Sequence, residues 1–342
     1  MSEKIKFAVV GFGHIGKRHA AMINGNDEGQ VVAVADILEE RRKEAKDILG
    51  DGVQVYSSIE ELLKNDEVEI VNICTPNGWH AKQALWTLEA KKHVVIEKPM
   101  GLNRQECEEV IFKSLQVSKQ AFIVKQNRYS PTSVWLKSLI EEGHLGKTFM
   151  VQMNCYWNRD ERYYKVGGWK GSKEMDGGVL FTQFSHFIDI MYWLFGDIKN
   201  INARFDNFTH KTNTEFIDSG FVGFEFINGG LGTINFSTSI YGQNMESSIA
   251  IIGEKGSVKV SGQYMDQVAY CHVKDYVMPE LPPANPPNDY GSYKGSAANH
   301  HYIIQNVVDV LKGRSQITTN ALEGMKVVEM IERIYQEGTY LA

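Results

Sequence analysis

IKFAVVGFGHIGKRHAAMINGNDEGQVVAVAD, residues 5–36, is the stretch that decides the fold of the first third of this chain. Its β-branched beginning predicts a strand, and Gly11, Gly13 and Gly16 then form a G-x-G-x-x-G pattern that opens a helical stretch. The first glycine permits a tight turn, the second lets a backbone approach a pyrophosphate, and the third allows close packing of the helix. A second apolar run ends at Asp36. The combination predicts a dinucleotide-binding βαβ unit with the anion at the helix N-terminus.

The residues around Asp36 favour NAD over NADP. A carboxylate at this place accepts hydrogen bonds from ribose hydroxyls and repels a 2′-phosphate, and the next residue is Ile37 rather than an arginine. Arg41 and Arg42 could turn toward a phosphate, but two solvated helix residues are the plainer interpretation. NAD is therefore the predicted cofactor.

Short apolar runs alternate with charged, helix-like stretches up to residue 125. Ser58 with Glu61, and Asn103 with Glu106, have the spacing of side chains that cap helices. Such alternation is typical of βαβ units around a parallel sheet. We therefore expect residues 1–125 to form a Rossmann domain with a doubly wound parallel sheet. Its expected strands are 5–10, 31–35, 53–56, 68–74, 93–96 and 121–124.

The character of the sequence changes after residue 125. Longer alternating segments predict a mainly antiparallel open sheet with flanking helices over residues 126–342, the proposed substrate-binding and oligomerisation domain. The fold class is thus α/β plus α+β, and the final helices could pack back on the first domain. Five of the eight prolines fall within 279–287, which indicates a loop or lid. The expected strands are 148–157, 216–226, 231–240, 247–252, 257–260 and 268–273, and the expected helices are 131–142, 177–196, 299–311 and 321–336.

The composition of the chain argues against several kinds of partner and site. With 36 Lys and Arg against 42 Asp and Glu, the formal net charge of -6 argues against a nucleic-acid surface. No leader segment and no membrane-spanning apolar run is visible, so a cytoplasmic protein without a membrane partner is expected. The four cysteines are too widely spaced for a zinc ribbon or a disulfide framework. His300 and His301 are adjacent, with no carboxylate or thiol at ligand spacing, so no metal site is predicted.

Polar residues follow three of the predicted parallel strands. Thr75-Pro76-Asn77, Glu97-Lys98-Pro99 and Asn127-Arg128 all stand at the carboxyl ends of strands, which is where open α/β sheets bind their ligands. Pro99 biases Lys98 toward extended backbone and so projects the lysine from the strand end. We expect Lys98 to take part in chemistry rather than to serve as a surface charge.

The stretch 177–196 is apolar around most of its circumference and predicts one buried helix. On such a helix Thr182, His186 and Asp189 fall within roughly 60° of one another. A polar stripe on a buried helix needs partners or a pocket. His186 is therefore either a satisfied core histidine or an active-site residue, and Asp189 either anchors the helix or orients His186.

The Glu97-Lys98-Pro99 motif, together with the glycine pattern, resembles the glucose-fructose oxidoreductase / inositol dehydrogenase / MocA family over nearly the whole chain. The resemblance implies that Lys98 lies beside the nicotinamide and the substrate hydroxyl, and that His186 completes the catalytic pair. Many members carry an aspartate four residues before this histidine, where this chain has Thr182, so an Asp-His relay is not expected. Members are commonly dimers or tetramers, which implies a homodimer or homotetramer. The expected cofactor-binding residues are Gly11, Phe12, Gly13, His14, Ile15, Gly16, Asp36, Thr75, Pro76, Asn77, His80, Glu97, Lys98 and Asn127.

The segment 159–173 holds five basic and two acidic residues, interleaved with aromatic ones. Aromatic faces against a sugar or base, and arginine forks toward phosphate or carboxylate, suit a nucleotide sugar, although a solvated loop can have the same composition. This segment, with 182–186 and 293–313, is similar to the nucleotide-sugar 3-dehydrogenases of cell-surface polysaccharide biosynthesis. The expected substrate-binding residues are Arg128, Arg159, Tyr163, Tyr164, Trp169, Thr182, Gln183, Asp189, Ser296, Asn299 and His300.

The resemblance implies an NAD-dependent dehydrogenase that oxidises a sugar secondary hydroxyl, at C3 of a UDP-N-acetylhexosamine or its uronic acid. We expect His186 to remove the hydroxyl proton and Lys98 to stabilise the developing alkoxide, with the two roles exchangeable. Three alternatives stay open: a dehydrogenase of inositol or a free sugar, a glycosidase or lyase that regenerates its NAD, and a non-catalytic dinucleotide-binding regulator.

Overall fold

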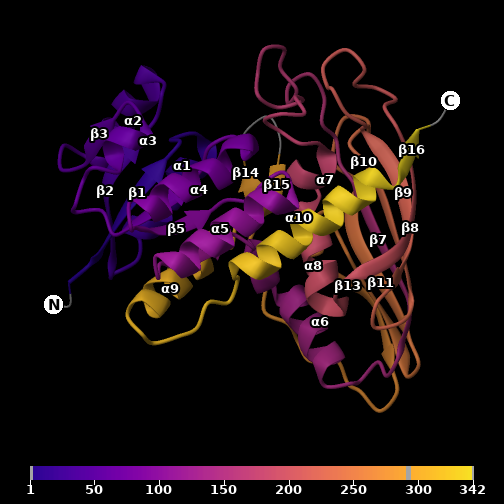
Figure 1. The fold of residues 1–342 in the computed structure, drawn as a ribbon. Coiled ribbons are helices and arrows are strands. Elements are labelled where there is room, and N and C mark those ends of the chain that lie inside the picture. Colours follow the sequence, from indigo (N-terminus) through magenta and orange to yellow (C-terminus); the bar gives the residue numbers. More distant parts are fainter. Residues whose placement is uncertain (1–2, 290–293, 341–342) are drawn as a thin grey trace. The chain divides into compact units, whose positions relative to one another are not determined.

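The protein is described by a computed structural model of residues 3–289 and 294–340. The chain divides into two compact units (Figure 1). The first combines Met1–Lys125 with His300–Val328, and the second combines Gln126–Asn299 with Glu329–Ala342. Each unit therefore draws on two separate stretches of the sequence.

The first unit is built on a parallel sheet of six strands in the order β3-β2-β1-β4-β5-β6. This is the doubly wound arrangement that the sequence predicts, and each of the six expected strands is present. Phe7, Ala8 and Val9 of the central strand are fully buried, as expected for a parallel sheet covered on both faces. The strands are β1 (Ile5–Val10), β2 (Gly29–Ala35), β3 (Gln54–Tyr56), β4 (Ile70–Ile73), β5 (His93–Ile96) and β6 (Ala121–Ile123).

Helices connect these strands, and two of them begin at the predicted caps. The Ser58 hydroxyl accepts the N–H of Glu61 at 3.3 Å, and the Asn103 side chain accepts that of Glu106 at 2.9 Å. α4 packs beside α5, and α1 beside α9 (Figure 1). The helices are α1 (His14–Asn24), α2 (Glu39–Leu49), α3 (Ile59–Leu62), η1 (Asn77–Trp79), α4 (His80–Glu89), α5 (Arg104–Gln116), α9 (His300–Leu311) and the first part of α10 (Ala321–Gln336).

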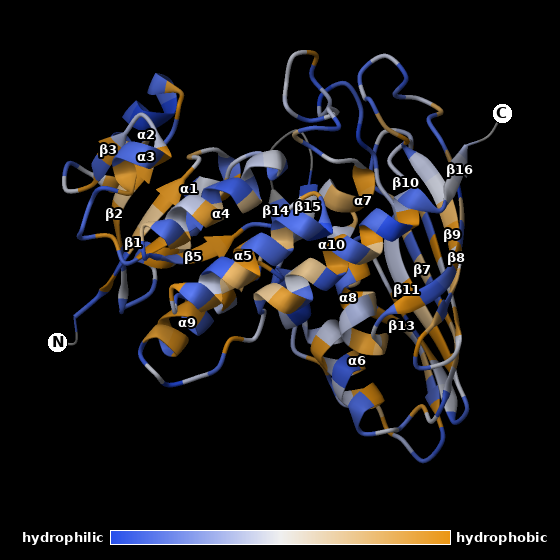
Figure 2. Ribbon diagram, in the orientation of Figure 1, coloured by the Kyte–Doolittle hydropathy of each residue, from blue (hydrophilic) through white to orange (hydrophobic). Residues whose placement is uncertain are grey.

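The second unit contains an eight-stranded sheet in the order β13-β12-β11-β7-β10-β9-β8-β16. Most neighbours are antiparallel, as predicted, but β7 pairs with β10 and β8 with β16 in parallel. One face packs against the helices of this unit, so its strands alternate between hydrophobic and polar residues (Figure 2). The strands are β7 (Thr148–Tyr156), β8 (Ile198–Asp206), β9 (Ser219–Phe226), β10 (Leu231–Ser237), β11 (Glu246–Gly253), β12 (Gly256–Ser261), β13 (Gln267–Val273) and β16 (Gly338–Tyr340).

Strands β8 and β16 are absent from the sequence prediction. Polar residues interrupt the alternation of β8, and Asn200 within it has a positive φ of 53° that shifts the register. The proline-rich segment also forms a short pair, β14 (Pro287–Asp289) with β15 (Lys294–Ala297). Residues 290–293 of that segment lie outside the described residues.

The predicted single helix over 177–196 is wrong. Gly177 and Gly178 have φ values of +82° and +118°, so the helix begins only at α7 (Val179–Thr182), and a break at residues 183–184 separates it from α8 (Ser185–Phe195). The three polar residues expected on one helix therefore lie on two, with Thr182 at the end of α7 and His186 and Asp189 on α8. The other helices of this unit are η2 (Gln126–Tyr129), α6 (Pro131–Glu141) and the last part of α10.

No helix within residues 3–289 and 294–340 has both the length and the apolar character that spanning a bilayer requires.

Candidate active site

The glycine-rich turn after β1 has the shape that a dinucleotide needs. Gly11 has a φ of +85°, and a Cβ on it would lie 2.7 Å from the carbonyl oxygen of Cys74. A Cβ on Gly16 would lie 1.9 Å from the carbonyl oxygen of Gly11, so turn and helix pack more closely than a side chain allows. Gly13 is the N-cap of α1 and provides no side-chain cap, an arrangement that presents helix N–H groups to an anion. The turn therefore fits a pyrophosphate.

Asp36 stands beside this turn and is held by the backbone. Its Oδ2 accepts the N–H of Phe12 at 2.7 Å, and its Oδ1 accepts the N–H of Leu38 at 2.9 Å. The Nη1 of Arg41 lies 3.5 Å from Oδ2, and Arg42 donates to the Asp36 carbonyl oxygen at 2.8 Å. Both arginines thus have protein partners that a purely solvated helix residue lacks.

His80 joins the turns that follow β4 and β5. Its Nδ1 lies 2.6 Å from the carbonyl oxygen of Pro99, and its Nε2 lies 2.8 Å from that of Thr75. Carbonyl oxygens only accept, so the charged ring satisfies both contacts and the neutral ring only one. Burial lowers the pKa of His80, and the two hydrogen bonds oppose that shift. His80 therefore ties two strand ends together, and Thr75 also donates to Gln83 at 2.7 Å.

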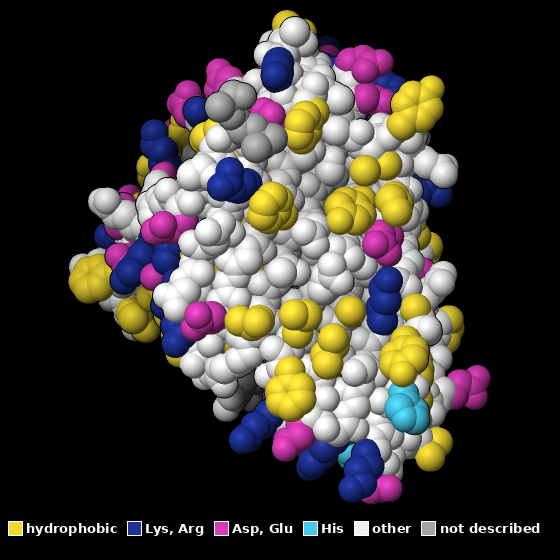
Figure 3. Space-filling view, turned by 90° about the vertical axis from the view of Figure 1, so that its right-hand side faces the viewer, with side chains coloured by type: hydrophobic (Ala, Val, Ile, Leu, Met, Phe, Trp, Pro, Cys, Tyr) yellow, Lys and Arg dark blue, Asp and Glu magenta, His cyan; other side chains and the backbone are white. Residues whose placement is uncertain are grey.

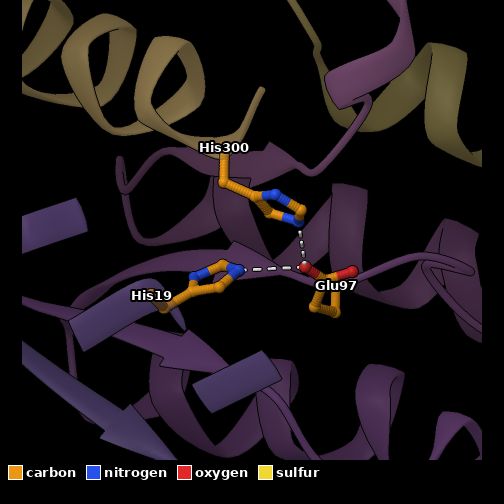
Figure 4. A group of neighbouring side chains, drawn as sticks. All are labelled: His19, Glu97 and His300. Atoms are coloured by element: carbon orange, nitrogen blue, oxygen red, sulfur yellow. Dashed lines mark hydrogen bonds and ion pairs between the residues drawn. The ribbon is translucent and has the colours of Figure 1, made fainter. Parts of the chain in front are cut away.

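Glu97 is the centre of a buried cluster in the first unit (Figure 4). Its Oε1 lies 2.9 Å from Nε2 of His19 and 3.4 Å from Nε2 of His300. Burial by itself would raise the pKa of Glu97, but the hydrogen bonds and charges of the two histidines outweigh it and hold that pKa well below its usual range. The structure thus places Glu97 and His300, both predicted ligand contacts, against each other.

The same three side chains meet the distance requirement of a metal site, with ligand atoms within 4.8 Å of one another. The contact between Asn72 and His19 distinguishes a metal site from a set of hydrogen bonds. Nδ2 of Asn72 lies 2.8 Å from Nδ1 of His19. An amide nitrogen only donates, so Nδ1 accepts and the ring proton sits on Nε2, facing Glu97. A metal would need the lone pair of that nitrogen. Hydrogen bonds therefore account for His19 and Glu97, whereas His300 faces Glu97 at an ion-pair distance of 3.4 Å.

Lys98 follows Glu97 in the chain, and the Glu97 side chain holds the backbone of Lys98. The second carboxylate oxygen of Glu97 accepts the Lys98 N–H at 3.1 Å, and the Lys98 side chain is half-buried. Sequence reasoning missed His19 and Asn72. Their signals are a polar residue on the apolar face of α1 and a polar residue inside an apolar strand, each nearly fully buried.

In the second unit, α8 carries two predicted site residues. His186 is 6% exposed. Asp189 accepts from both sides of the Arg128 guanidinium, with Nε at 2.8 Å and Nη2 at 2.7 Å, and the pair is almost fully buried. These contacts anchor α8 to η2, and they match the anchoring role considered for Asp189.

Asp176 is a buried acid that the sequence analysis did not single out. The Thr182 hydroxyl contacts its carbonyl oxygen and its Oδ1, and its Oδ2 accepts the N–H of Gly171 at 2.9 Å. A carboxyl group therefore stands beside Thr182, although position 182 itself has none. The signal in the sequence is an acid directly before the glycine pair that delays the start of α7.

Two predicted substrate residues, Arg159 and Gln183, contact a third, Tyr163. The hydroxyl of Tyr163 accepts from Nε2 of Gln183 at 2.9 Å. The guanidinium of Arg159 lies 5.1 Å from the Tyr163 ring centroid, and Nζ of Lys170 lies 3.7 Å from it. Two cations therefore stand against one aromatic ring, which favours an anion nearby.

The remaining predicted substrate residues are spread more widely. Tyr164 is buried and packs against His210 at 5.1 Å between ring centroids, so its contacts are those of a core residue. Trp169 is half-buried, 5.8 Å from Nζ of Lys170. His210 in turn lies 2.5 Å from the carbonyl oxygen of Arg159, and this contact fixes the start of the basic segment.

Ser296 and Asn299 belong to a buried polar network. Gln126 donates to the Ser296 hydroxyl at 3.0 Å, and Asn299 donates to the Gln126 carbonyl oxygen at 3.2 Å and to Ser130 at 3.1 Å. Asn127 and Asn77, both predicted cofactor contacts, are also buried. The network shows how the segment before α9 is held to η2.

Comparison with known proteins gives the family. Residues 5–124 match the model of an oxidoreductase family with an NAD-binding Rossmann fold, and residues 134–259 match the GFO/IDH/MocA C-terminal domain. The chain belongs to the Gfo/Idh/MocA oxidoreductases. This confirms the resemblance, the NAD cofactor and the enzyme class that the sequence predicts, and the non-catalytic alternative is set aside.

Other Gfo/Idh/MocA proteins are similar over most of the chain. The myo-inositol 2-dehydrogenase of Thermotoga maritima is 25% identical, over 74% of this chain and 74% of its own length. The WlbA dehydrogenase of Chromobacterium violaceum, solved with NADH and UDP-GlcNAcA, is 30% identical with a TM-score of 0.87, covering 98% of this chain and 94% of its own. WlbA of Bordetella pertussis, solved with the same two ligands, is 29% identical with a TM-score of 0.85, covering 98% and 96%.

Proposed function

We propose that this enzyme oxidises the C3 hydroxyl of a UDP-N-acetylhexosamine or its uronic acid, with NAD as the hydride acceptor. The observation that carries the proposal is the likeness to two dehydrogenases solved with UDP-GlcNAcA, which extends over 98% of the chain. The cations around Tyr163 support an anionic substrate in the second unit.

Lys98 and His186 carry the chemistry in this proposal. His186 removes the proton of the sugar hydroxyl, and the Lys98 ammonium stabilises the negative charge that develops on the oxygen. When bound, NAD would supply the acceptor for the hydride from the same carbon. The glycine turn at residues 11–16 would hold its pyrophosphate, and Asp36 would accept hydrogen bonds from its ribose.

Glu97 is a positioning residue in the same scheme. It holds the backbone N–H of Lys98 at 3.1 Å, and His19 holds Glu97. Because the carboxylate and both histidines are buried, the lysine is presented from a rigid support.

The exposed face of the second unit's sheet is our proposed site of self-association. Leu231, Met150 and Ile252 are direct neighbours across β10, β7 and β11, and they are 54%, 42% and 46% exposed. Phe221 and Tyr270 are exposed on the same sheet, and Figure 3 shows hydrophobic side chains spread over this side. A row of apolar side chains across a sheet fits a second copy of the chain.

We also infer a reducing, cytoplasmic setting. None of the four cysteines, all of which lie within the described residues, forms a disulfide, and Cys74, Cys107 and Cys155 are buried. Buried thiols that form no disulfide are usual where the surroundings are reducing.

A panel of substrates tests the function. Purified enzyme with NAD is given UDP-N-acetylglucosamine, its uronic acid, free N-acetylglucosamine and myo-inositol, and NADH absorbance is followed together with product mass. We expect NADH and a product lighter by two hydrogens from a UDP-sugar only. Product from myo-inositol, with none from either UDP-sugar, overturns the proposal.

Cofactor recycling is a second candidate, because the 2,7-anhydro-N-acetylneuraminate hydratase of Escherichia coli is 27% identical over 76% of this chain. The same panel separates it from a dehydrogenase. Recycling changes the sugar without net NADH, whereas a dehydrogenase forms NADH and ketone in equal amounts.

A further inference from the structure

His210 is a buried histidine in the turn between β8 and β9, and it is not among the predicted site residues. Its Nε2 lies 2.5 Å from the carbonyl oxygen of Arg159. A carbonyl oxygen only accepts, so Nε2 carries a proton and donates it. His210 therefore holds the main chain of a predicted substrate residue that lies 51 positions away in the sequence.

Asp218 holds the other side of the His210 ring. Its Oδ2 lies 3.0 Å from Nδ1, and the Thr209 hydroxyl lies 3.1 Å from the same nitrogen. Burial alone would raise the pKa of Asp218, but hydrogen bonds from His210 and from the N–H groups of Thr209 and Phe208 outweigh it and hold that pKa well below its usual range. The side chains of His210 and Asp218 are 4% and 1% exposed. A buried carboxylate that keeps its charge therefore fixes the orientation of the ring.

The main chain of Arg159 is held on both sides. Its N–H donates to the carbonyl oxygen of Thr238 at 2.9 Å, and its own carbonyl oxygen accepts from His210. The guanidinium lies 4.7 Å from the ring centroid of Trp157 and 5.1 Å from that of Tyr163. Because an arginine side chain has many rotamers, a fixed main chain narrows the positions that its guanidinium can take. His210 thus influences where the charge lies, although its hydrogen bond is to the backbone.

A chain of packed rings also connects His210 to Tyr163. His210 packs edge to face against Tyr164, with 5.1 Å between ring centroids, and Tyr164 packs in the same way against Tyr163 at 4.9 Å. Tyr164 is almost fully buried, so these rings have little room to shift. Nζ of Lys170 lies 3.7 Å from the Tyr163 ring centroid. The same histidine therefore supports both the arginine and the ring against which the second cation lies.

We propose that His210 is a positioning residue for the substrate, because its Nε2–H holds the main chain of Arg159 so that the guanidinium meets an anionic group of the nucleotide sugar. The inference rests on the proposed function, which supplies that substrate. Diphosphate oxygens and a uronate carboxylate share the chemistry that arginine N–H groups bind. His210 acts through the backbone of Arg159 rather than on the reacting atoms. Its loss therefore raises KM and Kd and leaves kcat in place.

Two substitutions separate the two donors of the ring. Glutamine places its amide N–H groups near the position of Nε2 and can still donate to Arg159, whereas the shorter asparagine reaches only toward Asp218. Calorimetric titration of the uronic acid of UDP-N-acetylglucosamine into NADH-loaded enzyme gives Kd without turnover. We expect His210→Asn to weaken binding by at least about tenfold, the loss of one charge-assisted contact, and His210→Gln to stay within about threefold of wild type. In the assay with NAD, KM should follow Kd while kcat stays within about threefold.

His144→Asn is the matched histidine control, in the loop after α6 where the ring contacts Glu142, and it should leave Kd unchanged. Wild-type affinity in His210→Asn, or an equal loss in His210→Asn and His210→Gln, overturns the proposal. A merely structural role would lower the amount of folded protein and leave the Kd of the folded fraction unchanged.

A second ligand identifies the anionic group. UDP-N-acetylglucosamine and its uronic acid share the diphosphate and differ in the carboxylate. An equal loss on both ligands in His210→Asn assigns Arg159 to the diphosphate, and a loss confined to the uronic acid assigns it to the carboxylate.

Two measurements need no sugar. The amide protons of Tyr163 and Tyr164, which both donate to the carbonyl oxygen of Asp160, should exchange faster in His210→Asn but not in His210→Gln, with β9 and β10 as in wild type. NMR of wild type with 15N-labelled histidine should show the proton on Nε2 of His210, and a bare Nε2 overturns the proposal even if neither variant folds. A wild type that binds neither nucleotide sugar overturns the proposed function, and the exchange rates then show separately whether His210 holds the segment.

Discussion

The Thr182 hydroxyl contacts both the carbonyl oxygen and a carboxyl oxygen of Asp176. A hydroxyl has one proton, and the carbonyl oxygen, at 3.0 Å, can only accept it. The threonine proton therefore serves either the carbonyl oxygen or Oδ1 of Asp176, both of which accept. Burial raises the pKa of Asp176 to about 6, against opposing hydrogen bonds from Thr182 and the N–H groups of Gly171 and Gly178. Burial thus outweighs the donors around this carboxyl group and extends its protonated form to higher pH.

This pair predicts a pH-dependent effect of Asp176→Asn on stability. The folded carboxyl holds its proton up to about pH 6 but the unfolded one only to about 3.8, so wild type loses stability as pH rises through this window. The loss approaches about 3 kcal/mol, because each pKa unit corresponds to about 1.4 kcal/mol. Asparagine does not titrate. Chemical denaturation at about pH 4 and about pH 7 should show that the stability of the variant relative to wild type is greater at the higher pH, and a constant difference would contradict the raised pKa of Asp176.

Lys98→Ala should reduce kcat by about 10²- to 10⁴-fold, the range for loss of a group that acts directly on the reacting atoms. Titration of NAD against protein fluorescence should give a Kd within about threefold of wild type, since the glycine turn supplies most of the cofactor contacts. Lys113→Ala, on the α5 surface where its side chain is 26% exposed, is the matched lysine control. Near-normal turnover by Lys98→Ala would remove Lys98 from the mechanism.

The variant Glu97→Gln distinguishes a role of Glu97 in positioning Lys98 from a role in the folding of the protein. We expect kcat to fall about tenfold while KM for the sugar changes little, because the substrate does not meet this side chain. A merely structural role would lower the amount of folded protein and leave kcat per folded enzyme unchanged.

Chelation should leave the enzyme unchanged. The tautomer set by Asn72 places a proton, rather than a lone pair, between His19 and Glu97. Dialysis against EDTA should therefore alter neither the melting temperature nor kcat, and elemental analysis should find substoichiometric metal. Loss of a stoichiometric ion together with a lower melting temperature would make the cluster a metal site.

Met150→Glu should dissociate the oligomer. A charge in the middle of the row with Leu231 and Ile252 would have to be desolvated in an interface. Size-exclusion chromatography with light scattering should show a smaller mass for this variant only. Val134→Glu replaces a hydrophobic residue of α6 that is 51% exposed and serves as the control. A wild-type monomer, or an equal effect of both substitutions, would exclude the sheet face.

The sequence predicts the first unit well because its signals are local. The strand before Gly11, the spacing to Gly16 and the acid at 36 all lie within one βαβ unit, and each acts through backbone geometry that neighbours in the chain determine. The caps at Ser58 and Asn103 are local as well, and the structure confirms both. Periodicity and composition predict these local features without any knowledge of tertiary contacts.

The side-chain partners could not be predicted in the same way. Apolar composition predicts a helix through 177–196, but the positive φ of Gly177 and Gly178 and the break at 183–184 depend on tertiary packing. Arg128 is 61 residues from Asp189, and nothing local in the sequence announces that they pair. His300 likewise meets Glu97 from the far end of the chain. Residue type indicated that these positions are polar and buried, and only the fold shows what each one contacts.

The discontinuity of the first unit has a consequence for biosynthesis. The backbone N–H of Ile123 in β6 donates to the carbonyl oxygen of Thr319. Lys312 donates to the Glu28 carboxylate across a separation of 284 residues. When the first 125 residues leave the ribosome, His300, Lys312 and Thr319 have not yet been translated. The NAD-binding unit must wait, with an incomplete sheet edge and with one of the two histidines around Glu97 missing, while the whole second unit is made. A premature stop anywhere before α9 would therefore disable the half of the protein that was synthesised first.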